Sequence, residues 1–593
     1  MEPNLDLAVI GNCTWGALID CRARLVWACL PRFDSDPLFP ALVDDAREDD
    51  GCFAIDLVDF ESCEQTYDGN TAILVTVLHD RAGNAVEVRD FAPRFVDRGR
   101  FYRPTMLMRR VRPLRGDPRI RIVLRPRYGY GSMRPSLTRG TNHLRIVTPD
   151  LTLRLTTQAP ISYVVDSVPF VLDQPIDLIL GPDESLFGAI DATAREFDER
   201  TRDYWAEWSR TLSIPFEWQD AVIRAAITLK LCHFEETGAI VAALTTSIPE
   251  APDSGRNWDY RFCWLRDAYF VIHALNQLGA TKTMEGFLSY IQNLAAGADG
   301  RLQPVYGIAL EANLEERTEP QLAGYRGMGP VRVGNLAYRQ PQNDVYGSLV
   351  LAATHSFFDQ RLLHRGGMRL FELLERFGAQ AVRLWDQPDA GLWEFRTRSQ
   401  VHTFSAAMCW AACDRLAKIA LRLGDAARAA RWRSEANRIR AGILERAWSE
   451  KQNSFAATFG GDGLDASLLL LNEIGFLAAD DPRFASTVAA VEKELRRGPY
   501  MMRYSAADDF GAPSTAFNVC TFWYIGALIT LGRREEAREL FENMLARRNR
   551  LGLLSEDIAL DTGELWGNFP QTYSMVGLIG VAMRLSKGWE DAF

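Results

Sequence analysis

The periodicity of the apolar residues changes once along this chain of 593 residues, and that change constrains the fold more than any other feature. From Leu7 to about Pro182, short alternating apolar runs are separated by turn residues, as in TAILVTVLHD (71–80) and IRIVLRPRYGYG (120–131). Alternation with a period of two, rich in β-branched residues and at close spacing, is typical of antiparallel strands. The first part of the chain is therefore predicted to be an antiparallel β-sandwich.

Beyond this part, the spacing of apolar residues becomes helical. A charged amphipathic stretch, ATAREFDERTRDYWAEWSRTL (192–212), predicts a connecting helix. About twelve further helical segments are predicted after Phe216, at 217–236, 265–279, 284–296, 336–358, 369–386, 402–422, 427–448, 464–473, 483–496, 514–531, 533–546 and 570–586.

The predicted helices alternate in character. FNVCTFWYIGALITLG (517–532) is apolar on nearly all sides, whereas RREEARELFENMLARR (533–548) has a wide charged face. All-round apolar helices are buried and amphipathic ones face water, so the alternation indicates an inner and an outer ring, an (α/α)6 barrel. A two-layer solenoid is the alternative, but no fixed-period repeat supports it. The prediction is a multidomain β + α chain: an N-terminal β-sandwich (a supersandwich) at 1–189, a linker helix at 190–215 and a barrel at 216–593.

Composition excludes several classes of protein. Hydrophobic residues make up 47% and charged residues 24%, which are values of ordinary globular proteins. The formal charge is 67 − 77 = −10, and no long run of Lys and Arg is present, so nucleic acid is not an expected partner. No window of about twenty apolar residues predicts a membrane helix. The first residues carry acids and no apolar run, so no signal peptide is predicted and a cytoplasmic location is expected.

The ten cysteines show no metal-binding pattern. They occur singly in apolar contexts, and only Cys409 and Cys413 have the spacing of two ligands on one helix. No His or second Cys pair completes a site there. Buried, reduced thiols and no metal site are therefore expected.

Two motifs in the C-terminal half each place a carboxylate close to aromatic residues. GLWEFR (391–396) carries Glu394, and LLSEDIALDTGELWGNFPQ (553–571) carries Glu556. Hydrolysis of a glycosidic bond needs one carboxylic acid to protonate the leaving oxygen and a second carboxylate to activate water or to attack the sugar. Either motif alone is also compatible with ordinary surface charge, because the chain has 77 acidic residues.

Further candidate residues precede the predicted inner helices. NWDYRFCWLRDAYF (257–270) combines three aromatic types with an Arg-Asp pair, and a Gly-rich loop at 324–347 contains PVRVGN. Arg and Asp side chains can hold sugar hydroxyls by hydrogen bonds, and Trp rings supply stacking faces. A helix cap and core Trp residues would explain the first motif equally well if it stood alone. The loops before the inner helices should meet at one end of a barrel, which favours a shared binding funnel.

These motifs resemble, over nearly the whole chain, those of glycoside hydrolase family 15, the glucoamylase and trehalase family, in its prokaryotic form. The opening NCTWGALIDCRARLVWACLPRFDSDPLF resembles the N-terminal signature of that form. The barrel signatures are matched in the same order by NWDYRFCWLRDA, PVRVGNLAYRQPQNDVYG, GLWEFR, LDASLLLL and LLSEDIALDTGELWGNFPQTYSMVGLI. The resemblance implies a β-sandwich joined by a linker helix to an (α/α)6 barrel.

The resemblance also implies roles for single residues. Glu394 matches the general acid of the family and Glu556 the general base, in a reaction that inverts the anomeric configuration and needs no metal or organic cofactor. The predicted substrate-binding residues are Arg266, Asp267, Trp264, Trp258, Arg332, Trp393 and Trp566. Trp393 and Phe395 are expected to give the acid apolar surroundings, whereas Glu556, in a polar loop, is expected to stay ionised.

Several other acids compete for these roles. Those before the Gly-rich loop could also reach the funnel, namely Glu315, Glu316 and Glu319. Asp508 and Asp509 precede an inner helix and are candidates to cap it or to contact substrate. At the start of that helix, the family often has an acid where this chain has Ser514 or Thr515, which removes support for transferring sugar contacts from that loop.

The predicted activity is that of an exo-acting, inverting α-glucosidase that releases β-glucose. A small carbohydrate is the expected partner, either trehalose or a short α-gluco-oligosaccharide, with a slight preference for trehalose. A glucoamylase acting on α-1,4 or α-1,6 glucan ends is the first alternative. A sugar phosphorylase and a catalytically silent glycan-binding protein are further alternatives. The oligomeric state is not readable from the sequence.

Overall fold

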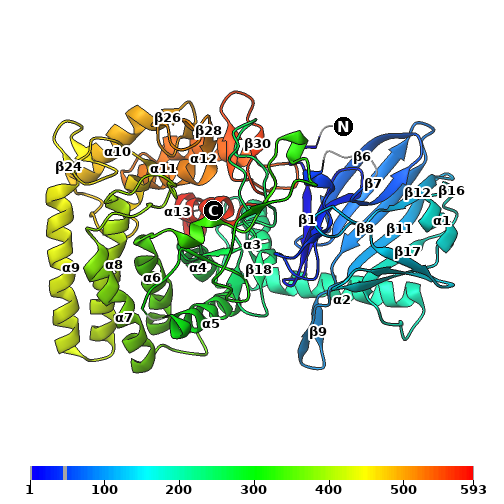
Figure 1. The fold of residues 1–593 in the computed structure, drawn as a ribbon, viewed down its shortest axis with the longest axis horizontal. Helices are drawn as coiled ribbons and strands as arrows, with labels where there is room; N and C mark the ends of the chain where they lie inside the picture. Colours follow the sequence, from blue (N-terminus) through cyan, green and yellow to red (C-terminus); the bar gives the residue numbers. More distant parts are fainter. Residues whose placement is uncertain (1–2, 45–49, 299, 592–593) are drawn as a thin grey trace.

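The computed structural model describes residues 3–44, 50–298 and 300–591. A β-rich part lies on the right of Figure 1 and a helical part on the left, with helix α2 (Ile190–Arg210) along the lower edge of the strands. This architecture confirms the predicted fold class. No helix within the described ranges is long and apolar enough to span a membrane.

The β-rich part consists of two antiparallel sheets. In strand order, the described residues of the first sheet form β1 (Ala8–Gly11), β2 (Gly16–Ile19), β3 (Arg24–Cys29), β5 (Phe53–Leu57), β12 (Arg119–Leu124) and β16 (Phe170–Val171), with β4 (Pro37–Phe39) beside β3. Those of the second form β13 (Ser136–Arg139), β14 (His143–Val147), β15 (Thr152–Thr157), β17 (Ile176–Pro182), β11 (Leu107–Arg115), β8 (Ala85–Phe91), β7 (Leu74–Asp80) and β6 (Phe60–Tyr67).

The two sheets share one apolar core. Alternate residues of β7 are buried, as its sequence LVTVLHD predicts, because side chains of a strand point to opposite faces. Ile55 of β5 and Val88 of β8 belong to the same buried cluster, so side chains from both sheets fill the space between them. A short hairpin, β9 (Phe95–Asp97) with β10 (Arg100–Tyr102), and helix α1 (Ile161–Asp166) complete this part.

The helical part is a double ring. Among the described residues, the inner ring contains α4 (Leu265–Gln277), α6 (Asp344–Phe358), α8 (Thr403–Arg422), the 3₁₀ helix η4 (Ala466–Leu471), α11 (Asn518–Thr530) and α13 (Thr572–Leu585). Each packs against the next in this order, and α13 packs against α4, so the ring closes. The outer partners, in the same order, are α5 (Thr281–Gly297), α7 (Met368–Leu384), α9 (Ala426–Arg446), α10 (Pro482–Leu495), α12 (Arg534–Ala546) and α3 (Gln219–Leu231).

Several predicted helices are shorter than expected, among them 217–236, of which α3 covers Gln219–Leu231, and 464–473, of which η4 covers Ala466–Leu471. Two others begin beside the site described below. The segment at 336–358 is split, because Pro341 lacks a backbone N–H and disfavours helical geometry in the residue before it. Only η3 (Leu336–Arg339) and α6 are helical there. The segment at 514–531 begins as strand β28 (Thr515–Phe517), which pairs with β29 (Asp557–Ala559) before α11 starts.

The β-rich part supports the barrel directly. The indole N–H of Trp27 in β3 donates to the carbonyl of Leu244 at 2.8 Å, and Trp27 shares a buried cluster with the barrel helices. The fully buried Arg261 pairs with Asp259 at 2.7 Å and donates to the carbonyl of Ser35 at 2.8 Å. The loop that leads into α4 is thus held in place by contacts with the N-terminal part.

Short strand pairs connect the helices of the helical part. They are β18 (His233–Phe234) with β19 (Ala239–Ile240), β20 (Cys263–Trp264) with β21 (Val305–Tyr306), β22 (Arg317–Thr318) with β23 (Arg332–Val333), β24 (Trp448–Ser449) with β25 (Ser454–Phe455), and β26 (Arg496–Arg497) with β27 (Tyr500–Met501).

Candidate active site

A pocket lies where the segments that precede the inner helices meet. It encloses about 890 Å³, counting its open mouth. Its walls come from the segments before α4, α6, α8, α11 and α13. Seven of the predicted site residues line it, namely Trp258, Trp264, Arg266, Asp267, Trp393, Glu394 and Glu556.

The Glu394 carboxylate is held by groups from two other segments. The indole N–H of Trp264 donates to its Oε1 at 2.7 Å, and the Gln342 amide donates to the same oxygen at 3.2 Å. The Arg266 guanidinium is 3.6 Å from this oxygen. A quarter of the Glu394 side chain is exposed to the pocket, at 24%. The carboxylate is thus oriented from one side and open on the other.

The backbone of Glu394 is strained. Its φ is 59°, in the left-handed region, which costs a residue with a Cβ on the order of 1 to 2 kcal/mol. The turn is closed by the Glu394 N–H donating to the carbonyl of Gly391 at 3.1 Å, and the Gln340 amide donates to the carbonyl of Glu394 at 3.1 Å. Gly391 itself has a φ of 66°, and a Cβ there would lie 2.8 Å from the His402 ring. The surroundings therefore impose the conformation that presents this carboxylate.

The residues that contact the Glu394 carboxylate differ from those predicted. The Trp393 indole N–H points to Asp465, 2.9 Å from its Oδ2, and the ring packs edge-on against Tyr504. Phe395 stacks on His402. Both residues line the pocket, but it is Trp264 that reaches the carboxylate. The sequence neighbours of Glu394 shape the loop, and the residues that contact its carboxylate come from other segments.

Arg266 and Asp267 lie in the first turn of α4, as predicted, and form a buried pair. Arg266 Nε is 3.4 Å from Asp267 Oδ1, and its Nη1 donates to Gln342 Oε1 at 3.1 Å. Burial raises the pKa of Asp267 to about 6, with Arg266 opposing the shift. Within the described residues, neither Arg266 Nε nor Asp267 Oδ1 makes a hydrogen bond. Both residues line the pocket, and these two atoms form an ion pair with each other.

Glu556 immediately precedes β29, which forms a short sheet with β28 and β30 (Leu565–Trp566), and its side chain is buried. The Tyr260 hydroxyl donates to its Oε1 at 2.7 Å. Its Oε2 makes no hydrogen bond with any described residue. The side chain therefore has one oxygen fixed by Tyr260 and one buried oxygen without a hydrogen-bond partner among the described residues.

The polar surroundings expected for Glu556 are not found, because the side chain is buried. The residue is only 1% exposed, and burial, with the nearby charges of Glu250 and Asp557, raises its pKa well above the usual value, against the opposing Arg503. The same environment raises the pKa of Asp557 to about 7. The sequence motif shows polar neighbours, but the pairing of β29 with β28 and β30 buries them, which periodicity does not reveal.

The two carboxylates are linked through a pair of aromatic rings. Tyr260, which holds Glu556, and Trp264, which holds Glu394, pack edge to face with their ring centroids 5.4 Å apart. Both rings come from the segment that leads into α4. The segment that leads into α4 therefore positions both carboxylates in one pocket.

A buried ion network beside Glu556 was missed by the sequence analysis. Arg503 pairs with Glu250, whose other oxygen accepts from the Trp258 indole at 2.9 Å. Arg256 donates to both oxygens of Asp508 at 2.7 and 2.6 Å. Trp258 is thus held by a carboxylate and not only by packing. No short motif signals these pairs, because their members are up to 253 residues apart.

Two predicted substrate contacts lie outside the pocket wall. The Arg332 guanidinium donates to the carbonyls of Gly255 and Asn257 at 3.2 and 3.1 Å and lies over the Trp258 ring. Trp566 is 2% exposed in β30, with its ring edge-on to Tyr325. Backbone pairing with Asp557 turns Trp566 into the interior. Neither residue is among those that line the pocket, and direct contact of either with substrate stays a prediction.

The competing acids are engaged elsewhere. Glu316 accepts two hydrogen bonds from Arg396, at 3.1 and 2.7 Å, and Glu319 accepts one from Arg317 at 2.8 Å. None of the three candidates at 315, 316 and 319 is among the residues that line the pocket.

Asp508 and Asp509 do line the pocket, but neither caps α11, whose N-cap residue is Phe517. Asp508 holds Arg256, and Asp509 accepts from the N–H of Arg396 at 2.7 Å. At the position where an acid was expected, the Thr515 hydroxyl bonds Asp557 Oδ1 at 3.1 Å.

The described parts of the chain contain no group of three or more His, Cys, Asp or Glu residues placed to hold a metal ion. None of the ten cysteines forms a disulfide, and eight of them are buried.

Comparison with protein families and with known proteins agrees with this geometry. Residues 218–583 match the model of Glycosyl hydrolases family 15, and residues 3–167 match that of the trehalase-like N-terminal domain. The chain is 33% identical to a trehalase of Thermoplasma volcanium over 589 residues, which cover 98% of this chain and 93% of that protein. It is 35% identical to a trehalase of Mycolicibacterium smegmatis over 405 residues, which cover 66% of this chain and 59% of that protein.

A solved structure shares the whole fold. A bacterial glucoamylase complexed with acarbose superposes with a TM-score of 0.72 at 14% identity, covering 99% of this chain and 94% of the glucoamylase. At that identity the likeness concerns the fold alone. The family model matches well over half of the chain, in the part that carries the pocket and both carboxylates. The chain therefore belongs to glycosyl hydrolase family 15, and the protein is a glycoside hydrolase.

Proposed function

We propose that this protein hydrolyses an α-glucoside with inversion of configuration and releases β-glucose, and that the α-glucoside is trehalose. The observation that carries the reaction is the single pocket in which Glu394 and Glu556 are held by the two touching rings of Trp264 and Tyr260. The choice of trehalose rests on relatives named trehalases, one of which aligns with 98% of this chain.

In this proposal Glu394 is the general acid. Trp264 and Gln342 donate to the same oxygen, which fixes the plane of the carboxyl group while leaving part of it open to the pocket. A proton donor must be in hydrogen-bond reach of the leaving oxygen, so a fixed carboxyl facing the pocket suits that role. The strained loop contributes by directing this side chain inward.

Glu556 is the general base that takes a proton from the attacking water. Tyr260 fixes Oε1, and Oε2, which has no hydrogen-bond partner among the described residues, would accept the proton of that water. The raised pKa of Glu556 requires that the group lose its proton before it can act as a base. The rate should therefore rise with pH through a pKa above the usual carboxyl range, and Arg503 limits how high that pKa lies.

Arg266 and Asp267 bind hydroxyl groups of the glucose unit that is released. Both side chains are buried and line the pocket, where the Asp267 carboxylate can accept a hydrogen bond and the Arg266 guanidinium can donate one. A glucose unit that lacks the matching hydroxyl should bind poorly.

Other functions remain distinguishable. A glucoamylase would use the same two acids and differ in the part of the pocket beyond the first glucose. A phosphorylase would replace the base by phosphate and would need a basic pocket, whereas the group at that position is Glu556, with Glu250 and Asp557 as near neighbours. A silent glycan-binding protein would have no use for two oriented acids.

The test is glucose release from trehalose, maltose, isomaltose, kojibiose, nigerose and maltotetraose in phosphate-free buffer. We expect trehalose to be the preferred substrate, with no glucose 1-phosphate formed when phosphate is added. Preference for maltotetraose over trehalose would replace trehalase by glucoamylase activity. Turnover that depends on phosphate and gives glucose 1-phosphate would refute hydrolysis.

A further inference from the structure

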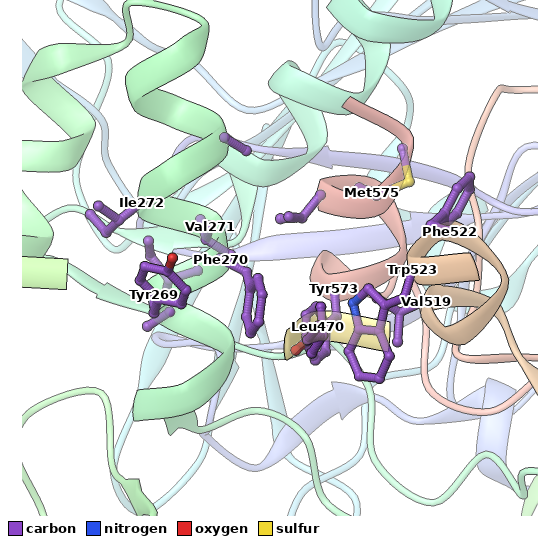
Figure 2. Packing of buried hydrophobic residues seen from close by; sticks show 14 of the residues in the cluster. Tyr269, Phe270, Val271, Ile272, Leu470, Val519, Phe522, Trp523, Tyr573 and Met575 are labelled. Atoms are coloured by element: carbon purple, nitrogen blue, oxygen red, sulfur yellow. The ribbon is translucent and has the colours of Figure 1, made fainter. Parts of the chain in front are cut away.

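Two of the ten cysteines are partly exposed, Cys21 and Cys63, whereas the other eight are buried. Cys520 of α11, for example, belongs to the same buried cluster as Trp523 and Tyr573, whose packing Figure 2 shows. Burial raises the pKa of the Cys520 thiol well above its usual value. Because the thiolate is the reactive form of cysteine, a thiol buried in this way is inert. Reaction with a reagent in solution is therefore expected at Cys21 and Cys63.

One face of strand β6, which carries Cys63, lies against the first sheet. Residues 63, 65 and 67 are partly or fully covered, whereas 62, 64 and 66 are exposed, as alternation along a strand requires. On the covered face, the Tyr67 hydroxyl bonds the backbone of β1 at 2.9 Å, and the Gln65 amide donates to the carbonyl of Asp20 at 2.9 Å. Asp20 begins the turn between β2 and β3. The next residue on this face, Cys63, is thereby brought to that turn.

The turn holds Cys21 against Cys63. The Asp20 carboxylate accepts hydrogen bonds from the N–H groups of Arg22 and Arg24, each at 2.9 Å, which fixes the shape of the turn. The Cys21 and Cys63 thiols are hydrogen-bonded to each other. One sulfur thus comes from a turn of the first sheet and the other from the edge strand of the second sheet. Two thiols in this contact need only a small approach to form a disulfide.

A cation from the barrel contacts both thiols. The Arg550 guanidinium, from the segment between α12 and β29, donates hydrogen bonds to Cys21 and Cys63 and pairs with Asp6 at 3.0 Å. Burial and the neighbouring thiol raise the pKa of Cys63 to about 11, and Arg550 opposes that shift. Attack on a disulfide needs the thiolate, which a guanidinium stabilises. Arg550 therefore offsets part of the cost of forming a thiolate at this pair.

We propose that Cys21 and Cys63 are a redox-active pair, which a low-molecular-weight disulfide converts into a disulfide within the chain. One protein thiolate attacks a sulfur of the small disulfide, whose S–S bond breaks, so that a mixed disulfide forms and one small thiolate leaves. The second protein thiolate attacks the protein sulfur of the mixed disulfide and releases the other small thiolate. The protein thereby loses two protons and two electrons, and the small disulfide is reduced to two thiols. The new bond joins the two sheets, and its formation does not depend on the function proposed above.

The test is incubation with an excess of oxidised glutathione, followed by unfolding, alkylation of the remaining thiols and peptide mass spectrometry. We expect a linked peptide that contains Cys21 and Cys63, with eight alkylated thiols where the untreated protein has ten. Cys21→Ser and Cys63→Ser should each stop at a mixed disulfide with one glutathione, because no second thiol can displace it. Cys413→Ala removes a buried thiol elsewhere and is the matched control, in which the link should still form.

Arg550→Met tests the part played by the cation. Loss of Arg550 raises the pKa of Cys63, so less thiolate is present at neutral pH, and conversion of the mixed disulfide into the Cys21–Cys63 link should slow by about threefold. Arg550→Lys keeps the charge and should react at nearly the wild-type rate. Wild-type protein that keeps all ten thiols in oxidised glutathione would overturn the proposal, as would a link between any other two cysteines. An unchanged rate in Arg550→Met would overturn the role of Arg550.

Discussion

The two carboxylates of this site, Glu394 and Glu556, differ in backbone, in exposure and in charged neighbours. Glu394 sits on a strained turn, partly open to the pocket and 3.6 Å from the Arg266 cation. Glu556 immediately precedes strand β29 and is buried among other acids, and its pKa is raised. The difference teaches that the local backbone directs one acid, whereas burial and neighbouring charges set the protonation of the other. Changes to the turn should alter geometry, and changes around Glu556 should alter pH dependence.

The largest expected effects come from the carboxylates themselves. Glu394→Gln and Glu556→Gln should each lower turnover of trehalose by about 10² to 10⁴-fold with the melting temperature preserved, because each removes one proton transfer. α-Glucosyl fluoride separates the two roles, since fluoride leaves without being protonated. Glu394→Gln should hydrolyse it well and Glu556→Gln should not. Activity near wild type in either variant would refute its assignment.

Arg503→Met removes the cation from the cluster around Glu556 and Glu250. Loss of one partner of a buried pair should destabilise the fold by about 3 to 5 kcal/mol. Arg503 lowers the pKa of Glu556, so its removal should raise that pKa and move the acidic limb of the pH–rate profile to higher pH. The measurements are urea unfolding and kcat/KM against pH. Arg503→Lys keeps the charge and is the control; an acidic limb that stays in place in Arg503→Met contradicts the electrostatic account.

Tyr260→Phe removes the hydroxyl that fixes Glu556 Oε1 and keeps the ring that packs on Trp264. A hydrogen bond to a charged group contributes about 1.5 to 3 kcal/mol, so kcat should fall by about 10 to 100-fold. KM should change little if the hydroxyl serves the base and not the substrate. A rise in KM at constant kcat would instead make Tyr260 a substrate contact.

The smallest effect tests the strained turn. Glu394→Gly should be more stable than Glu394→Ala by about 1 kcal/mol, because glycine alone adopts a φ of 59° without strain. Both variants lack the carboxylate, so the comparison isolates the backbone. Equal melting temperatures for the two variants would show that the turn is not held under strain.

Much of this fold could be predicted from periodicity, and the exceptions have physical causes. The alternation of buried and amphipathic helices indicated the two rings, because burial follows directly from apolar pattern. Pro341 and the pairing of Thr515–Phe517 with β29 shortened two predicted helices. Both exceptions occur where irregular backbone brings Gln342 to Glu394 and Thr515 to Asp557.

The site residues that stand in sequence motifs were predicted, whereas their partners from distant parts of the sequence were missed. Trp264, Arg266, Asp267, Glu394 and Glu556 stand in motifs and line one pocket. Glu250 and Arg503 meet across 253 residues, and no local pattern marks such a pair. Trp566 and Arg332 were placed by motif as well, but a motif does not reveal whether a side chain faces the pocket or the core.

The most direct test of the central claim is to identify, by proton NMR before mutarotation, which anomers of glucose are released from trehalose. If Glu394 is the acid and Glu556 activates water, a single displacement gives β-glucose first from the unit bound by Arg266 and Asp267, with α-glucose from the leaving unit in equal amount. Release of α-glucose alone would show net retention and contradict the roles assigned to the two carboxylates.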